Sequence, residues 1–242
     1  MRVSLGVIRQ DALETLRPPA DSPHGRLPPL LIVLTVVTGL VDALSYLRLG
    51  HVFVANMTGN VVFLGFAIGG ASGLSLPASL VAIALFLVGG VAGGRIGATL
   101  GEHRGSALRA GTTFQLVLVT GATIVAGVAG VHDGASRYTL IVLLATAMGM
   151  QNAVVRRLAV PDLTTTVLTQ TLTGIAADLR IAGGSEAHVG RRLLAVVAML
   201  LGAVVGALLV VHVAHWISLA LAAALLAGVA AGARSADRGP AE

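Results

Sequence analysis

Cysteine and lysine are both missing from this chain of 242 residues, and its sixteen basic residues are all arginine. Without cysteine the chain can form no disulfide framework, no thiolate nucleophile and no cysteine-ligated metal centre. Without lysine it has neither the phosphate-binding lysine of a Walker-type loop nor an amine that could form a Schiff base. These absences exclude several large classes of enzyme and metalloprotein.

Charged and aromatic residues are scarce, at 11% and 3% of the chain, whereas hydrophobic residues make up 55%. This balance is far from that of a soluble globular domain and is typical of a chain that crosses a bilayer. The arginines are scattered and no basic run is interleaved with aromatic residues, so we expect no nucleic-acid partner. The G-x-S-x-G, H-E-x-x-H and G-x-x-x-x-G-K patterns are also absent. We therefore expect an integral membrane protein that is not an enzyme, with no catalytic residues, no metal site and no cofactor.

Apolar runs that could cross a hydrocarbon core, which takes roughly 20 helical residues, recur along most of the chain. They lie at 30–48, 78–100, 111–131, 138–156, 193–213 and 215–233. Two further segments, 53–72 and 163–182, have a helical pattern but are too polar in their first halves for ordinary lipid-facing spans. The sequence thus predicts an all-α membrane bundle of six spanning helices, in which two polar segments form half-helices, re-entrant hairpins or additional spans.

The positions of the arginines favour six spans over eight, because short cytoplasmic loops of membrane proteins are enriched in basic residues. With six spans, every arginine except Arg48 and Arg137 falls on the inner side. With eight spans, the outer side would hold Arg48, Arg95, Arg104, Arg109, Arg156 and Arg157. We therefore predict six spans with both termini in the cytoplasm.

The two halves of the chain share a weak internal repeat. The pentapeptide GLVDA, which contains Asp42, recurs in the second half as GMQNA, which contains Asn152. Glycines at a four-residue spacing, which let helices pack closely, also recur in both halves: Gly93 and Gly97 in the first, Gly202 and Gly206 in the second. Because three spans per half is an odd number, the second half enters the membrane from the opposite side, as a 3+3 inverted repeat. Eight spans would instead give a parallel 4+4 repeat.

A single transmembrane domain is expected at residues 29–233, with one repeat at 29–131 and the other at 138–233. Residues 1–28 and 234–242 are interpreted as cytoplasmic tails. The first tail is rich in arginine and proline, which predicts a disordered or weakly amphipathic segment. No signal peptide is expected, because the first apolar run begins late and continues for a full span.

The segment GLVDALSYLRLGHVFVANMTGN, with its weaker second copy AMGMQNAVVRRLAVPDLTTTVLTQTLTG, resembles the YoaK family of small bacterial integral membrane proteins. The resemblance covers residues 30–233, and its most specific part is FVANMTGN at 53–60. It implies a multi-pass protein of about six spans in the bacterial inner membrane. It transfers no substrate and no activity, so function has to be argued from the site.

Asp42 is the most informative single residue. An acidic side chain in the middle of an apolar helix costs about 2.5 to 3.5 kcal/mol on translocon scales, so it should face protein or a water-filled cavity. It shares one helical face with Thr38, four residues earlier. Asp42 is either a proton or cation site or a structural hydrogen-bonding group, and its counterpart Asn152 keeps the shape without the charge.

Polar side chains also open each of the two polar segments, and in both they lie at helical spacing. The first segment supplies Asn56, Thr58, Gly59 and Asn60, and the second supplies Thr166, Thr169, Gln170 and Thr173. Such groups can replace the hydration shell of a small solute, and a glycine lets the backbone approach it. The alternative is that they only bond helix to helix.

These features favour a secondary transporter or permease for a small solute, with Asp42 as the candidate proton-coupling group. The alternative is a membrane scaffold or sensor that transports nothing, in which the polar residues hold helices together. Expected partners are the lipid bilayer and an unidentified solute, and the glycine-rich helix faces are compatible with a homodimer.

Overall fold

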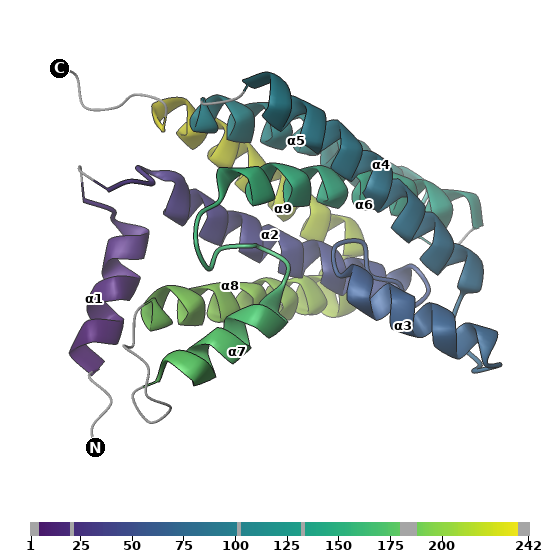
Figure 1. Cartoon of the computed structure of the whole chain (residues 1–242). Helices are drawn as coiled ribbons and strands as arrows, with labels where there is room; N and C mark the ends of the chain where they lie inside the picture. The colour runs from purple at the N-terminus through teal and green to yellow at the C-terminus, as the bar shows by residue number, and fades with distance from the viewer. Residues whose placement is uncertain (1–4, 20–21, 101–102, 132–133, 180–187, 237–242) are drawn as a thin grey trace.

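The structure is a computed structural model that describes residues 5–19, 22–100, 103–131, 134–179 and 188–236. Within these ranges every regular element is helical (Figure 1). The helices long and apolar enough to cross a membrane are α2 (Leu27–Arg48), α4 (Leu76–Leu100), α5 (Arg104–Val128), α6 (Gly134–Leu158), α8 (Val189–Leu208) with its π-helical continuation η2 (Leu209–Val213), and α9 (His215–Gly232). A short 3-10 turn, η3 (Ala233–Ser235), follows α9. The prediction of an all-α bundle with six spanning helices is confirmed.

The long helices expose apolar side chains on their outer faces. Val128 is 85% exposed and Leu87 is 62% exposed, a surface that suits lipid tails and would be unfavourable in water. Two prolines, Pro28 and Pro29, lie in the first turn of α2, where a missing N–H breaks no helical hydrogen bond. The bundle therefore has the surface expected of a membrane domain.

The two helices that follow extended segments within the bundle are too short to span. They are α3 (Met57–Ile68) and α7 (Leu168–Asp178), with 12 and 11 residues. At 1.5 Å per residue each extends roughly 16 to 18 Å, little more than half of the hydrocarbon core. They lie within the predicted polar segments 53–72 and 163–182, so these segments hold half-helices. In the part of the chain that the structure describes, the eight-span alternative lacks two helices of sufficient length.

The N-terminal tail contains a helix, α1 (Leu5–Leu16), where the sequence suggests a disordered or weakly amphipathic segment. α1 lies across the start of α8 (Figure 1). A Cβ added to Gly190 would collide with the backbone of Ile8. Asp11 Oδ2 accepts a hydrogen bond from the backbone N–H of Arg191 at 2.8 Å. Helix α1 is therefore fixed to one end of the bundle.

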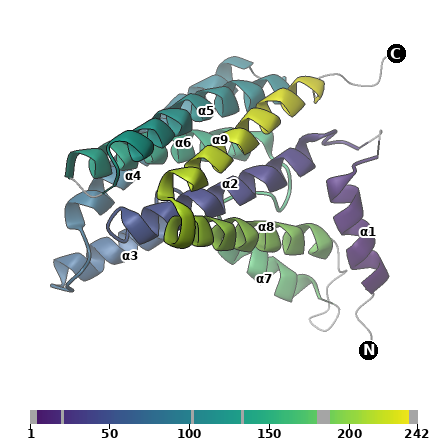
Figure 2. The same cartoon turned by 180° about the vertical axis from the view of Figure 1, so that it is seen from behind.

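Two closely packed helix pairs form the centre of the bundle: α2 with α8, and α4 with α6. A Cβ added to Gly39 of α2 would collide with the backbone of Met199 in α8. A Cβ added to Gly149 of α6 would collide with the backbone of Phe86 in α4. Glycine thus permits backbone contact in both pairs. Helix α5 packs on α6 and α9, and α9 lies along α2 (Figure 2).

The partner helices contribute glycines to the same contacts. A Cβ added to Gly93 of α4 would lie 2.6 Å from the carbonyl oxygen of Met150 in α6. A Cβ added to Gly206 of α8 would lie 3.0 Å from the Cα of Leu40 in α2. Met150 and Leu40 directly follow Gly149 and Gly39 in the GMQNA and GLVDA motifs, so Gly93 and Gly206 occupy matching places in the two pairs.

In the sequence Gly93 corresponds to Gly202 and Gly97 to Gly206, whereas the helix contacts match Gly93 with Gly206, one helical turn away. Gly202 lies against the α2 backbone, but Gly97 faces only the side chain of Arg157. The physical reason is that a Gly-xxx-Gly spacing repeats every turn along α4, so sequence alone does not fix which turn meets the neighbouring helix.

Candidate functional site

Extended segments interrupt the chain between α2 and α3 and between α6 and α7. The residues that precede the two half-helices have almost the same backbone conformation, with φ −97° and ψ 82° at Asn56 and φ −100° and ψ 82° at Val167. Neither half-helix has a side-chain cap at its first turn. Both helix starts line one cavity of about 700 Å³.

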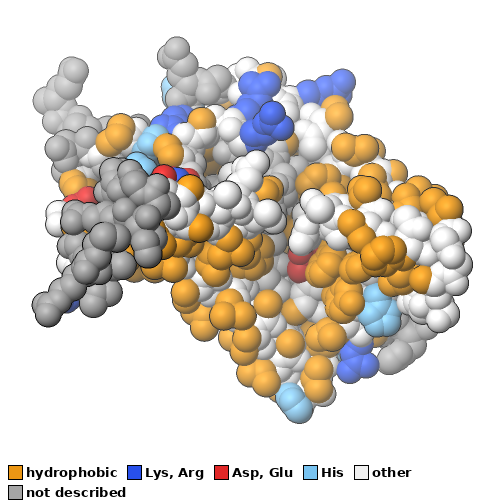
Figure 3. All heavy atoms as spheres, turned by 60° about the horizontal axis from the view of Figure 1, so that its bottom comes forward, with side chains coloured by type: hydrophobic (Ala, Val, Ile, Leu, Met, Phe, Trp, Pro, Cys, Tyr) orange, Lys and Arg blue, Asp and Glu red, His pale blue; other side chains and the backbone are white. Residues whose placement is uncertain are grey.

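This central cavity is enclosed by α2, the two half-helices and parts of α4, α6 and α8. Figure 3 looks onto this side of the molecule, where hydrophobic side chains surround a hollow in which acidic atoms are visible. The lining residues are Gly39, Asp42, Ala43, Tyr46, Leu47, Phe53, Ala55, Asn56, Met57, Thr58, Gly59, Phe86, Asn152, Thr166, Val167, Leu168, Thr169, Met199, Ala203 and Ala207.

Asp42 joins α2 to the segment that leads into α3. Its Oδ1 accepts hydrogen bonds from the backbone N–H groups of Val54, at 3.1 Å, and Ala55, at 2.9 Å. The side chain is only 9% exposed. Within the described part of the chain, Oδ2 accepts no hydrogen bond, and it is not among the fully enclosed atoms. One oxygen of this buried carboxylate is therefore structural, and the other is open to the cavity.

Asn152 holds the corresponding position in the second half. Its Oδ1 accepts a hydrogen bond from the hydroxyl of Thr166 at 2.6 Å, and its Nδ2 donates to the carbonyl of Met148 at 3.1 Å. As in the first half, the side chain bonds the extended segment that precedes the half-helix. The two halves differ in charge, because the first places a carboxylate in the cavity and the second places an amide there.

The start of each half-helix offers backbone donors to the cavity. The first three N–H groups of an α-helix have no partner within the helix, and no side chain caps them at α3 or α7. Thr58 and Thr169 add hydroxyl groups for which the described residues supply no hydrogen-bond partner. Helix starts of this kind favour negative charge or hydrogen-bond acceptors.

Aromatic rings form one wall of the cavity. Tyr46 and Phe53 are stacked with their ring centroids 5.0 Å apart, and Phe63 extends the stack at 5.9 Å from Phe53. A Cβ added to Gly59 would lie 2.7 Å from the Phe53 ring, so this glycine makes room for it. Sequence reasoning missed these rings, although Tyr46 lies one helical turn after Asp42 on the same face.

Four of the predicted site residues do not line the central cavity. Thr38 bonds the carbonyl of Leu34, and Thr173 bonds that of Thr169. Asn60 is fully buried and bonded to Phe53. Gln170 lines a different cavity. The predicted residues that the structure does bring together are Asp42, Asn56, Thr58, Gly59, Asn152, Thr166 and Thr169.

A second cavity of about 630 Å³ adjoins the first. The two cavities share Phe86, Asn152 and Val167 in their linings. From there the second cavity extends along the last turns of α6 to Arg156 and Ala159. The two adjoining cavities thus lie between the half-helix starts and the arginine-rich end of α6.

A buried amide pair that the sequence analysis missed supports the break before α7. Gln115 Nε2 donates to Gln151 Oε1 at 2.7 Å. Gln151 Nε2 donates to the hydroxyls of Thr38, at 3.0 Å, and Thr165, at 3.1 Å. Gln151 lies directly before Asn152, and a glutamine inside an apolar span was the available signal. The network joins α2, α5 and α6 to the extended segment.

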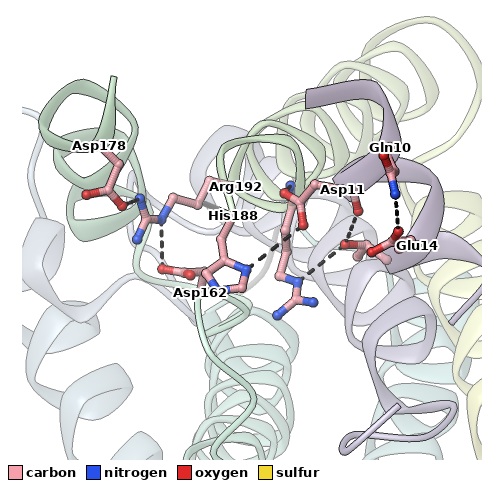
Figure 4. Close-up of polar contacts among 9 residues, drawn as sticks. Gln10, Asp11, Glu14, Asp162, Asp178, His188 and Arg192 are labelled. Atoms are coloured by element: carbon pink, nitrogen blue, oxygen red, sulfur yellow. Dashed lines mark hydrogen bonds and ion pairs between the residues drawn. The ribbon is translucent and has the colours of Figure 1, made fainter. Parts of the chain in front are cut away.

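An ion-pair cluster lies at the end of the bundle where α7 ends and α8 begins (Figure 4). Arg192 Nε lies 2.7 Å from Asp162 Oδ1, and its Nη1 contacts Asp178 Oδ2. Asp162 belongs to the segment before α7 and Asp178 is the last residue of α7. Arg192 of α8 therefore holds α7 from both ends, beside the contact that joins α1 to α8.

No group of three or more histidine, aspartate or glutamate side chains with metal-binding geometry occurs among the described residues. The cavity likewise presents no basic side chain from this part of the chain. The chemistry that the site offers is thus hydrogen bonding and charge recognition within an apolar chamber.

Comparison with known proteins places the chain in a family. Residues 30–232 match the model of a family described as a protein of unknown function, DUF1275. The chain is 34% identical over 154 residues to the UPF0700 transmembrane protein YoaK of Bacillus subtilis (strain 168), a match that covers 62% of this chain. The match spans 66% of that relative's length, and no solved structure matches the chain. The chain belongs to the DUF1275 family of transmembrane proteins, of which YoaK is a relative.

Proposed function

We propose that the protein is a secondary transporter for a small solute, coupled to protons through Asp42. The observation that carries this proposal is the central cavity, in which a buried carboxylate with one open oxygen faces the uncapped starts of two half-helices. Interrupted helices whose ends meet around a cavity are the usual way for a membrane protein to bind a polar solute at membrane depth.

The second cavity supports a transport pathway. A binding pocket with a purely local role needs no neighbour, but a second cavity adjoins this one at Phe86, Asn152 and Val167 and reaches Arg156. These three shared residues separate the central cavity from a neighbouring vestibule. Movement of the Phe86 or Val167 side chain would join the two spaces.

The matching helix contacts support an inverted repeat. Asp42 and Asn152 make corresponding bonds to the segments before the half-helices. Helix α2 of the first half pairs with α8 of the second, while α6 of the second half pairs with α4 of the first, and α2 and α6 run in opposite directions (Figure 1). In transporters with inverted repeats, one repeat rocks against the other around a fixed site, which exposes the site to each side in turn.

The placement of arginine supports a bacterial inner-membrane protein with both termini in the cytoplasm. Helix α1 and the end of α9 lie at the same end of the bundle (Figure 1). The helix ends there carry Arg104, Arg156, Arg157, Arg191, Arg192 and Arg234. At the opposite end, Arg48 donates a hydrogen bond to the carbonyl of Val210, and Arg137 lies close to Gly50. The arginine-rich end is the cytoplasmic one by the positive-inside rule.

The alternative of a scaffold or sensor takes its support from Thr38 and Asn60, which bond only to the protein. Those residues lie outside the cavity lining, however, whereas the side chains of Asn56, Thr58 and Thr169 line it without any hydrogen-bond partner among the described residues. Polar groups that served only to join helices would be bonded.

Reconstitution into liposomes that contain a pH-sensitive dye tests the proposal. Imposed gradients of candidate solutes should drive proton movement in vesicles with the native chain, and Asp42→Asn should abolish the response to a pH gradient of either sign. Thr173→Ala, an exposed position outside the cavity, is the matched control and should transport normally. If the native protein moves neither solute nor charge under any gradient, the scaffold alternative replaces the transporter.

A further inference from the structure

We infer that the transported solute is a small zwitterion with an apolar body, bound with its ammonium group at Asp42 and its carboxylate at the start of α7. The inference rests on the proposed transport function and names its substrate class. It follows from an electrostatic asymmetry between the two ends of the central cavity.

The negative end is Asp42. Its Oδ1 is fully used by the N–H groups of Val54 and Ala55, while Oδ2 faces the cavity without a partner among the described residues. Asp42 is only 9% exposed. A buried carboxylate oxygen of this kind is best satisfied by a cationic N–H donor, which forms a charge-assisted hydrogen bond. No basic side chain of the described residues lines the cavity to provide one.

The positive end is the start of α7. Its N-cap residue, Val167, has no side-chain acceptor, so no side chain accepts a hydrogen bond from the N–H groups of Leu168, Thr169 and Gln170. Asn152 stands where the first half has Asp42, and its amide brings no negative charge. The start of α3 differs, because the Asp42 carboxylate is bonded immediately before that helix and offsets its positive end. Only α7 retains an uncompensated positive end, which suits a carboxylate.

The walls between these ends are mostly apolar and aromatic. Tyr46, Phe53, Phe86 and Met199 line the cavity, and about 700 Å³ is ample for a small molecule. A simple anion would face the Asp42 charge, and a simple cation would leave the start of α7 unsatisfied. A zwitterion with an apolar side chain can bond to Asp42 through its ammonium group and to the start of α7 through its carboxylate, while its side chain packs against the apolar wall.

Binding to the purified full-length protein in lipid nanodiscs tests the inference by isothermal titration at pH 7. The probes are leucine, 3-methylbutylamine, which lacks the carboxylate, and 4-methylpentanoate, which lacks the amine; glycine and phenylalanine vary the size of the apolar body. We expect at least one of the three amino acids to bind, and leucine to bind at least tenfold more tightly than either analogue.

Asp42→Asn should weaken amino-acid binding at least tenfold, because the ammonium contact is lost, and should leave 4-methylpentanoate binding as tight as before or tighter, because the charge that opposes an anion is removed. The asparagine retains an acceptor for Val54 and Ala55, and an unchanged unfolding midpoint would show that the fold is intact. Thr173→Ala should bind like the native protein.

Two results would overturn the zwitterion assignment: 4-methylpentanoate or 3-methylbutylamine binding as tightly as leucine, or no binding of any of the three amino acids. Neither result decides transport itself, which the liposome experiment tests separately. A native protein that moves protons with a simple anion would thus reject the zwitterion and keep the transporter, whereas no flux with any solute would reject both.

Discussion

Asn60 binds both backbone groups of Phe53: its Oδ1 accepts the N–H at 2.9 Å and its Nδ2 donates to the carbonyl at 2.6 Å. This bidentate contact folds the extended segment back onto the first turn of α3. It thereby holds the Phe53 ring against Tyr46 and keeps the Asp42 contact in place. The half-helix is thus positioned by a side chain from within its own first turn.

Asn60→Ala should lower the stability of the protein by about 1 to 3 kcal/mol, because the part-buried N–H and carbonyl of Phe53 both lose their partner. Asn56→Ala, four residues earlier and exposed in the cavity, should leave stability unchanged and alter solute affinity. Unfolding in detergent followed by circular dichroism measures the first effect, and titration of solute measures the second. Equal stability losses for both variants would show that Asn60 has no special structural role.

Gly149→Ala should destabilise the α4–α6 pair, because the added methyl group would meet the backbone of Phe86, which cannot move aside as a side chain can. The expected cost is about 1 to 3 kcal/mol, as for other overpacked interfaces. Gly94→Ala is the matched control on the facing helix, since no atom lies within 4 Å of the added Cβ. Thermal unfolding should separate the two variants, and a native-like Gly149→Ala would contradict the observed contact.

Arg192→Gln should loosen α7, because Asp162 and Asp178 lose the cation that joins them. Hydrogen exchange followed by mass spectrometry should show faster exchange across residues 168–178. Arg191→Gln is the matched neighbour: its side chain bonds Thr15 of α1 at 3.3 Å, so faster exchange should appear in α1 instead. If the two variants gave the same exchange pattern, the separate roles of the two arginines would be wrong.

His24 should titrate below its ordinary pKa of 6.5, because burial lowers its pKa and the nearby Arg104 guanidinium lowers it further. Arg104 also donates a hydrogen bond to His24 Nδ1 at 3.3 Å, which requires that nitrogen to be unprotonated. The unfolded chain therefore binds the proton more readily, and the His24 contribution to stability is lost as the pH falls from about 6.5 through the lower folded pKa. NMR titration of ring-labelled histidine, with His24→Gln to assign the signal, measures this; a pKa at or above 6.5 would contradict the contact.

The helices themselves were predictable, because an apolar run of spanning length and a polar interruption are both properties of local sequence. The polar segments also indicated where the half-helices begin, and seven of the predicted residues do line the central cavity. These signals depend only on residue type and spacing along one helix.

The neighbour that each polar side chain contacts was less predictable, because it depends on how each helix is rotated about its axis relative to its neighbours. Thr38 and Asp42 share one face of α2, yet Thr38 meets Gln151 and Asp42 meets the segment before α3. The contact of Arg192 with Asp162 joins residues far apart in the chain, which no local pattern reveals. The one-turn displacement at Gly97 has the same origin.

Accessibility of the central cavity from both sides of the membrane is the most direct test of the transporter. The chain has no cysteine, so Thr169→Cys, in the cavity lining, and Gly73→Cys, in the α3–α4 connection, each introduce one thiol. With a membrane-impermeant thiol reagent, we predict that Thr169→Cys reacts from either side in turn and that Gly73→Cys reacts from the outer side alone. Reaction of Thr169→Cys from one side only, under every gradient applied, would contradict alternating access to this cavity.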